Sequence, residues 1–490
     1  MNDALQYSYG HRPGAVDYMA FRTADATETT LQSALTTSAF YDCATLDPAI
    51  LKQRTEEFAE HLSWSRARIL EHQQTSLRQI LRHAASKSPY FRDAIGKLVE
   101  TDAPLESYPT MGKSILMAEF DRIVTDPRLT RTMVEDHAGS RNCGELLLDE
   151  YRVVATGGSS GQRGVFVYDR DSWEIVNGTL RRWHQVSGAP PSPRVVGIGA
   201  PSPVHLSNRF CAEIRGINTK APRLSVVTPI EEIVEALNSY QPQIVITYPS
   251  LIRRLAEEQV AGRLKISPAT MRSVAEALSP DVREIARATW NIQIINGYTS
   301  TEVAGIASEC FAHNGLHLND DMLIVEIVDD DLRPVPPGKP GSKALITSFL
   351  KNTIPIIRYE FSDILIAIEG PCACGCQFQR IKDVEGRREE MLYTTTPDNR
   401  RVEVHAPRFW FHLVRVPGIR NYQFAQLPEG IAIRIVPDPS HDSGVVKAAV
   451  EQIARMALAD LGAQNGHLEV HIVDDIRRTG SAAKQKLVAT

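Results

Sequence analysis

Short β-rich runs alternate with helical stretches between about residues 150 and 365 of this 490-residue chain. The β-rich runs occupy 194–200, 242–249 and 292–298, and the stretches with helical spacing occupy 229–240, 250–263 and 279–290. This alternation is typical of a sheet with many parallel neighbours, because each parallel connection needs a crossover, usually a helix. We therefore predict an α/β fold with a large, multi-layer α/β N-terminal domain.

The pattern changes beyond about residue 386. A β-rich run at 431–436, a helical stretch at 443–461 and a second β-rich run at 467–476 predict a small α+β unit. We expect a large domain over 51–386 and a small C-terminal domain over 387–490. Residues 1–50 are polar and weakly patterned, so we expect a variable, loosely packed extension there. Residues 51–87 have few helix breakers and predict one or two helices.

Composition excludes several classes of protein. Lys plus Arg is 54 and Asp plus Glu is 59, a formal charge of −5, so neither nucleic acid nor an anionic membrane is an expected partner. No apolar run approaches the ~18 residues of a membrane helix. The first residues lack the apolar segment of a signal peptide, so we predict a cytoplasmic protein. Its seven cysteines are an odd number, which disfavours a disulfide framework.

A loop of small residues lies between two β-rich runs at 151–168. Its members are Thr156, Gly157, Gly158, Ser159, Ser160 and Gly161. Glycines leave backbone N–H groups free to point at one spot and hydroxyls add donors, which suits a polyphosphate. A Walker A loop ends in Lys-Ser/Thr and opens a helix, whereas here Arg163-Gly164 and a β-rich run follow. A flexible hairpin loop is the alternative interpretation.

The loop resembles the phosphate loop of the adenylate-forming enzymes, the superfamily of acyl-CoA synthetases, adenylation domains and luciferases. Tyr298–Glu302 resembles the Tyr-Gly-x-Thr-Glu motif, with Thr299 in place of Gly, and 358–363 resembles Arg-Tyr-x-x-x-Asp. Residues 386–390 resemble the hinge motif Gly-Arg-x-Asp-Asp, with Glu for both acids. Residues 478–484 resemble the segment that carries the catalytic lysine, with Ala483 where Gly is usual.

Further segments resemble one branch of that superfamily, the phenylacetate–CoA ligases. They are LRHAASKSPYFR at 81–92, 109–113, ECFAHNGLHL at 309–318 and CACG at 372–375. The resemblance covers roughly residues 75–490 and depends on several motifs in the family's order. Arg163 and Gly164 depart from the Pro and Lys of many members.

The resemblance implies a reaction in two halves. A carboxylate, here an aryl or arylacetic acid, attacks the α-phosphate of ATP and releases pyrophosphate, and coenzyme A then takes the acyl group from the adenylate. The small domain is expected to be mobile and to rotate about a hinge at Glu390 between the halves. ATP, Mg²⁺ and coenzyme A are the implied cofactors. A homodimer is among the assemblies it permits.

The resemblance also implies a role for individual residues. Loop 156–161 would hold phosphates, Glu302 would hold Mg²⁺, Asp363 would bind the ribose and Tyr298 would flank adenine. Lys484 is implied to be catalytic, together with Glu302 and Thr301. The remaining implied nucleotide contacts are Ala275, Glu276, Gly297, Thr299 and Arg387, and the implied substrate contacts are His205 and Tyr248. The alternatives are a helix N-terminal acid for Glu302, a turn cap for Asp363 and a solvated charge for Lys484.

A cysteine cluster falls in the window from 310 to 376. Thiolates and imidazole suit zinc in a closed tetrahedral site. Some members of the resembled branch hold a structural zinc with such a set, which implies Cys310, His317, Cys372 and Cys374 as ligands. His313 and Cys376 are the reserve ligands, and cysteines packed as small hydrophobes are the alternative.

Two other functions remain open from the residues. The activated acyl group could pass to an amine, a carrier protein or another small nucleophile instead of coenzyme A. The chain could also be a nucleotide-binding partner protein that has lost catalysis.

Overall fold

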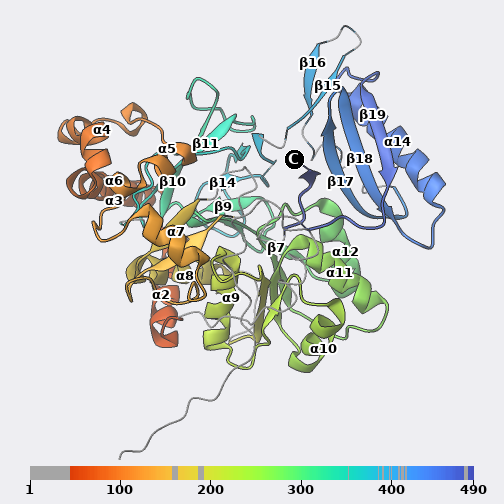
Figure 1. The fold of residues 1–490 in the computed structure, drawn as a ribbon, viewed down its shortest axis with the longest axis horizontal. Coiled ribbons are helices and arrows are strands. Elements are labelled where there is room, and N and C mark those ends of the chain that lie inside the picture. Colours follow the sequence, from red (N-terminus) through yellow and green to blue (C-terminus); the bar gives the residue numbers. More distant parts are fainter. Residues whose placement is uncertain are drawn as a thin grey trace, which may run out of the picture.

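The computed structural model describes residues 45–156, 164–185, 192–350, 353–384, 386–388, 391–396, 398, 400–404, 406, 409, 413, 416–478 and 484–489. The fold has a large α/β body and a smaller α+β unit that contains β15 to β20 and α14 (Figure 1). The predicted α/β architecture is therefore confirmed. Gly157 to Gly161 of the glycine-rich loop, and Glu390, lie outside the described residues.

Helices open the described chain, in line with the prediction for residues 51–87. They are α2 (Pro48–Glu60), α3 (Arg66–Lys87), α4 (Pro89–Glu100), α5 (Lys113–Ala118), α6 (Phe120–Ile123) and α7 (Arg131–Gly139), with 3-10 turns at His61–Ser63 and Leu105–Ser107. The stretch forms two helices because Ser65 interrupts it and caps α3, accepting from the Arg68 amide. Leu46 is buried and donates its amide to Glu213 at 2.9 Å, so packing begins within the predicted extension.

The glycine-rich loop connects two short, buried antiparallel strands. These are β1 (Arg152–Ala155) and β2 (Val165–Tyr168), paired from Arg152 with Tyr168 to Ala155 with Val165. A strand therefore follows the loop, as predicted, and the Walker A alternative is excluded by this hairpin.

The central sheet has nine strands in the order β13-β14-β9-β8-β7-β6-β5-β3-β4. Its strands are β3 (Val195–Gly199), β4 (Leu224–Ser225), β5 (Ile244–Thr247), β6 (Thr270–Ser273), β7 (Ile294–Ser300), β8 (Ala304–Glu309), β9 (Leu316–Leu318), β13 (Ala367–Ile368) and β14 (Arg380–Ile381). Neighbours from β4 to β7 are parallel and those from β7 to β13 are antiparallel. The change of direction at β7 turns the chain back at residues 301–303, which places the Tyr298–Glu302 motif at the carboxyl end of β7.

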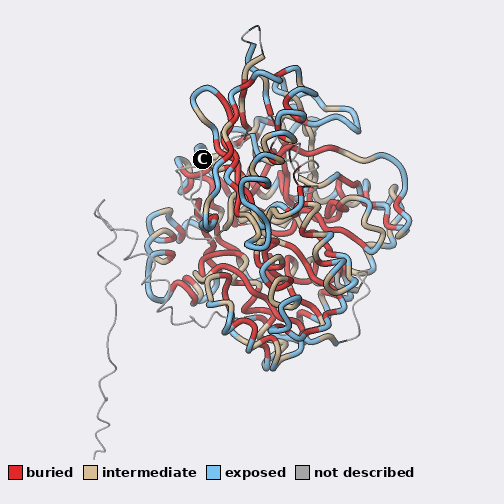
Figure 2. Tube along the Cα trace, turned by 90° about the vertical axis from the view of Figure 1, so that its right-hand side faces the viewer, coloured by how far each residue is buried: buried red, intermediate tan, exposed pale blue. Residues whose placement is uncertain are grey.

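Helices and a second sheet surround the central sheet. The helices are α8 (Arg170–Gln185), α9 (Leu206–Ile217), α10 (Ile230–Tyr240), α11 (Pro249–Val260) and α12 (Pro280–Trp290). The second sheet is antiparallel and contains β10 (Leu323–Val328), β11 (Lys343–Ser348) and β12 (Tyr359–Phe361). Buried residues follow the interior strands, and exposed residues gather at the periphery (Figure 2). No helix of the described residues has the length and apolarity that a membrane crossing needs.

The C-terminal unit has a core of its own. Its elements are the hairpin β15 (Leu392–Thr395) and β16 (Arg401–Val404), β17 (Ile419–Leu427), β18 (Gly430–Pro437), α14 (Ser443–Ala459), β19 (His467–Ile472) and β20 (Val488–Ala489). The four-stranded sheet has the order β19-β18-β17-β20. Phe424, Ile433 and Val450 are fully buried between this sheet and α14. The strands and the helix predicted for this region are confirmed.

Candidate active site

A cavity of about 890 Å³ lies between the large body and the C-terminal unit. All the predicted nucleotide, catalytic and substrate residues that the structure describes line it. They are Thr156, His205, Tyr248, Ala275, Glu276, Gly297, Tyr298, Thr299, Thr301, Glu302, Asp363, Arg387 and Lys484. The cavity therefore collects segments that are more than 300 residues apart in sequence, from Thr156 to Lys484 (484 − 156 = 328).

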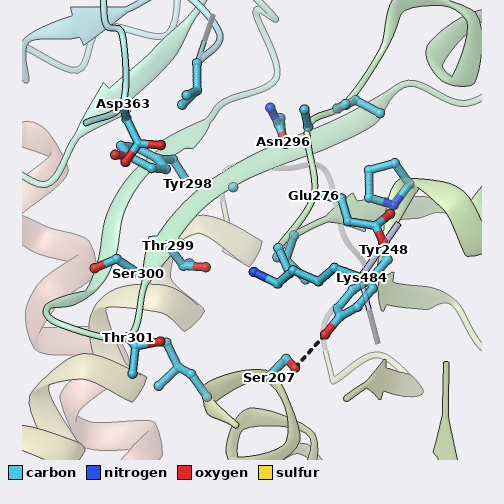
Figure 3. Close-up of a pocket in the computed structure, with 18 of the residues that line it drawn as sticks. Ser207, Tyr248, Glu276, Asn296, Tyr298, Thr299, Ser300, Thr301, Asp363 and Lys484 are labelled. Atoms are coloured by element: carbon cyan, nitrogen blue, oxygen red, sulfur yellow. Dashed lines mark hydrogen bonds between the residues drawn. The ribbon is translucent and has the colours of Figure 1, made fainter. Parts of the chain in front are cut away.

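Tyr298, Asp363 and Arg387 form one side of the cavity. Figure 3 shows the Asp363 carboxylate beside the Tyr298 ring. Arg387 donates through Nε to Asp363 Oδ1 at 3.3 Å, and Asp363 is buried. Burial raises the pKa of the Tyr298 phenol well above its usual value, and the Asp363 charge adds to this effect. The uncharged Tyr298 ring thus lies beside the Asp363 carboxylate, which Arg387 holds in place and whose oxygens can accept hydrogen bonds.

The turn after β7 presents Thr301 and Glu302. A bulge between Tyr298 and Thr299 interrupts the pairing of β7 with β8, and bulges are frequent beside active sites, where they redirect side chains. The Tyr168 hydroxyl of β2 donates to the Thr301 carbonyl at 3.0 Å, which fixes the turn against the hairpin of the glycine-rich loop. Burial raises the pKa of Tyr168, and so does the negative charge of nearby Glu302.

Lys484 enters the cavity from the C-terminal unit. Its side chain extends into the space between Thr299, Glu276 and Tyr248 (Figure 3). Burial lowers the pKa of Lys484, with a further contribution from the Arg387 charge, while Glu276, Asp363 and Glu302 oppose the shift.

The chain around Lys484 is held at Glu276. The Gln485 amide donates to Glu276 Oε1 at 2.6 Å, and Arg478 Nη1 lies 3.4 Å from the same oxygen. These contacts join the small unit to the large body directly beside the lysine.

His205 and Tyr248 lie where the chain enters α9 and α11. His205 is buried and its Nδ1 lies 3.2 Å from the Ala155 carbonyl. The Tyr248 hydroxyl lies 3.0 Å from Ser207 Oγ, and burial raises the pKa of this phenol. Both residues line the cavity, and their contact with an acyl substrate stays a prediction. No sequence motif predicted Ser207 as a cavity residue.

Lys113 is a cavity residue for which the sequence predicted no role. Its Nζ donates to Thr156 Oγ1 at 3.1 Å, and the same oxygen accepts from the Gly164 amide at 2.8 Å. A Cβ on Gly164 would lie 2.8 Å from Lys113 Cε. Lys113 therefore occupies the space beside Gly164, the position where many adenylate-forming enzymes carry the loop lysine.

The four predicted zinc ligands converge on one point. The ligand atoms of Cys310, His317, Cys372 and Cys374 all lie within 4.8 Å of one another. Cys310 Sγ and Cys372 Sγ are 3.7 Å apart, and Cys374 Sγ is 3.3 Å from His317 Nε2. Burial lowers the pKa of His317 to about 4, which keeps its imidazole neutral. The reserve residues His313 and Cys376 are outside this group of four.

Comparisons with known proteins agree with this geometry. The model of the AMP-binding enzyme family matches residues 210–343. A phenylacetate-coenzyme A ligase of Thermus thermophilus is 26% identical over 299 residues, which are 57% of this chain and 63% of that ligase. The chain thus spans slightly less than two thirds of that relative.

Solved structures share the fold. A 2-hydroxyisobutyryl-CoA ligase in the postadenylation state, in complex with R3-HIB-AMP, has a TM-score of 0.68 at 16% identity, covering 85% of this chain and 88% of its own. The same ligase in the thioesterification state has a TM-score of 0.56 at 16% identity, covering 87% and 90%.

Proposed function

We propose that this chain, which belongs with the adenylate-forming enzymes and their phenylacetate–CoA ligase-like branch, is an ATP-dependent carboxylic acid ligase. It would form an acyl-adenylate from an aryl or arylacetic acid with release of pyrophosphate, and then transfer the acyl group to coenzyme A. One observation carries the proposal: Glu302, Asp363 and Lys484 line one cavity although they come from three separate segments.

The nucleotide would lie across β7 and the loop of Asp363. An ionised carboxylate accepts from two hydroxyls at once, so Asp363, held by Arg387, would bind the ribose. The neutral Tyr298 ring would flank the adenine, and the Ala275–Glu276 and Gly297–Thr299 backbones would border it. Thr156 and Lys113 would bind the phosphates at the base of the glycine-rich loop, because Lys113 brings a positive charge to the end of that loop.

The first half-reaction joins two anions, so the protein must compensate charge and align the reactants. Lys484 is a cation that lines the cavity, and although burial lowers its pKa, its carboxylate neighbours oppose that shift and favour the charged form. Glu302 would hold Mg²⁺, a cation that prefers oxygen ligands and, when bound, would neutralise phosphate charge. The Tyr168 hydrogen bond to the Thr301 carbonyl keeps this turn in place.

The acid would occupy the side of the cavity between the central sheet and helices α8 and α9. This side is lined by apolar side chains that include Leu180, Trp183, Phe210, Ile214 and Ile246. An aromatic ring suits such a surface, because burying its area provides affinity without hydrogen bonds. His205 and Tyr248 border this side and would contact the acyl group.

The second half-reaction would require the C-terminal unit to move. We propose residues 387–490 as a mobile domain, residues 51–386 as the large domain, residues 1–50 as a variable extension and Glu390 as the hinge. The separate core of the C-terminal unit supports this division, since a rigid-body rotation leaves both cores intact. The contacts of Gln485 and Arg478 with Glu276 would break in the rotation.

We also propose that Cys310, His317, Cys372 and Cys374 hold a structural zinc. Two thiolates at ~2.3 Å from one tetrahedral zinc lie about 3.8 Å apart, and Cys310 Sγ and Cys372 Sγ are 3.7 Å apart. Four protein ligands would leave no open coordination position, so the metal would stabilise the fold and take no part in the reaction. The ring of Trp183, on α8, stacks on His317, which links the cluster to the wall of the cavity.

The proposed function has a direct test in two steps. Acid-dependent exchange of pyrophosphate into ATP, measured over aryl, arylacetic and short aliphatic acids, reports the first half-reaction. Thioester formation with added coenzyme A reports the second. Exchange without thioester formation favours a non-CoA acceptor such as an amine or a carrier protein. Nucleotide binding without exchange on any acid would overturn the ligase proposal.

We also propose the cytoplasm as the compartment of this protein and a homodimer as its assembly.

A further inference from the structure

Arg272 is a charged residue in the middle of the central sheet. It lies on β6, where every residue from Thr270 to Ser273 is buried, and it is 4% exposed. It also lines the large cavity. The inference drawn from it rests on the proposed function and concerns the chemical class of the acid.

The strand register places Arg272 on the side of the sheet that faces the acyl region. Arg272 pairs with Ile295 of β7, and side chains alternate along a strand, so it shares a face with Ile295 and Gly297. Tyr298 projects from the opposite face. Arg272 is therefore separated by the sheet from the Tyr298 ring.

The guanidinium has few partners for a buried charge. Its Nη2 donates to Ser308 Oγ at 2.7 Å, and its Nη1 is buried with no hydrogen-bond partner in the part of the chain that the structure describes. The nearby Glu309 carboxylate accepts hydrogen bonds from Arg283 Nη2 at 2.9 Å and Nη1 at 3.1 Å. It also accepts from the Asn296 amide at 2.6 Å. Burial lowers the pKa of Arg272 to about 10, which leaves it charged at neutral pH.

A buried guanidinium with an unpartnered nitrogen is costly, because desolvation is not repaid by an opposite charge. A second guanidinium, that of Arg181, lines the same cavity. Glu213 lines it too, but its carboxylate accepts from the Trp173 indole at 2.7 Å and the Leu46 amide at 2.9 Å. The acyl side of the cavity thus carries excess positive charge among apolar walls.

Arg272 is also far from the reacting end. Its partner Ser308 lies six residues along the chain from Glu302, a span of roughly 15–20 Å in extended chain. Lys484 and Glu302 mark the end of the cavity where the carboxylate of the acid would react. Arg272 therefore faces the opposite, distal end of a bound acyl group.

We propose that Arg272 determines substrate specificity by binding a second oxygen-bearing, preferably anionic, substituent at the distal end of the acid. The substrate class is then a dicarboxylic or hydroxylated aryl or arylacetic acid. Such a substituent would accept a hydrogen bond from Nη1 and, where it is anionic, neutralise the buried charge of Arg272. An unsubstituted acid would leave Nη1 without a partner and the charge without compensation.

Pyrophosphate exchange on phenylacetates that carry carboxyl, hydroxyl or methyl at ring positions 2, 3 or 4, and on the matching benzoates, tests this inference. We expect the wild-type kcat/KM for the best carboxyl or hydroxyl acid to exceed that of its methyl analogue at least 100-fold. Arg272→Met should reverse or abolish this preference with little loss on the methyl acid, and Arg272→Lys should keep part of it. Arg287→Met, on the exposed face of α12, is the matched control and should retain the wild-type ratios.

The outcomes separate this inference from the proposed function. Exchange on methyl acids at the same kcat/KM as on their carboxyl and hydroxyl analogues would overturn the role of Arg272 but support the ligase. No exchange on any acid would overturn the proposed function. If Arg272→Met is not folded by circular dichroism, Ser308→Ala replaces it, since loss of the Nη2 partner frees the guanidinium and should change the same specificity ratio. An unchanged ratio in that variant would also overturn the inference.

Discussion

The backbone amide of Gln485 donates a 2.6 Å hydrogen bond to the side chain of Glu276, and this bond connects the C-terminal unit to the large body one residue from Lys484. Arg478 lies 3.4 Å from the same carboxylate oxygen. Both partners belong to the segment that brings the lysine into the cavity. We therefore infer that Glu276 is a positioning residue for Lys484, in addition to the nucleotide contact proposed for it.

Replacing Glu276 by Ala should slow adenylation more than thioester formation. We expect a 10- to 100-fold loss in kcat for pyrophosphate exchange, because the arrangement with Lys484 in the cavity loses its main anchor. Thioester formation from supplied acyl-adenylate should change less than 5-fold. Glu257→Ala is the control, since Glu257 also contacts the C-terminal unit, through Arg420 at 2.6 Å, but is not among the residues that line the cavity. Equal losses in both half-reactions would contradict this role.

Replacing Lys484 by Ala should remove most of the first half-reaction. Loss of one preorganised charge contact in a water-poor site costs about 3–4 kcal/mol, or 100- to 1,000-fold in rate. Lys447→Ala, at a half-exposed position of α14 outside the cavity lining, is the matched control. If Lys484→Ala forms acyl-adenylate at the wild-type rate, the lysine is only a solvated charge.

The rate of adenylation should also depend on pH through Lys484. The proposed role of Lys484 requires its charged form, and burial lowers the pKa of this lysine below the ordinary 10.5. Activity should therefore fall as pH rises, with a midpoint below that of a solvated lysine. A pH profile of the exchange rate at saturating substrates measures the midpoint, and a profile that stays flat to pH 10.5 would contradict the prediction.

Local patterns of apolar residues in the sequence predicted much of the fold. The runs at 194–200, 242–249 and 292–298 became the parallel strands β3, β5 and β7, because continuous apolar runs between amphipathic helices specify a sheet buried on both faces. The order of the motifs likewise predicted that Glu302, Asp363 and Lys484 would meet.

The residues that were missed depend on long-range geometry. Lys113 lies next to Gly164 only because the hairpin β1–β2 packs near the start of α5, and no local spacing encodes that approach. Arg272 interrupts a buried strand, a signal that sequence alone could not interpret, since its partner Ser308 and the face it occupies follow from the register of β6, β7 and β8.

Replacing Lys113 by Ala should weaken ATP binding. Lys113 donates to Thr156 at the base of the glycine-rich loop, so we expect KM for ATP to rise about 10-fold or more and KM for the acid to change little. Gly164→Ala should act in the same way, because its Cβ would displace Lys113. Lys97→Ala, on the exposed face of α4, is the control. An unchanged KM for ATP in both Lys113→Ala and Gly164→Ala would contradict the assignment.

Removing one thiolate of the cysteine cluster should release the proposed zinc. We expect Cys372→Ser and Cys374→Ser to contain well under one zinc per chain and to unfold at a lower temperature, because four side chains would lose their shared partner. Cys376→Ser is the matched control, since Cys376 is buried nearby but outside the group of four. Elemental analysis of protein purified without chelator, with thermal denaturation of the same samples, provides both measurements. Wild-type protein without zinc, or a Cys376→Ser variant that alone loses it, would show that the ligand set is wrong.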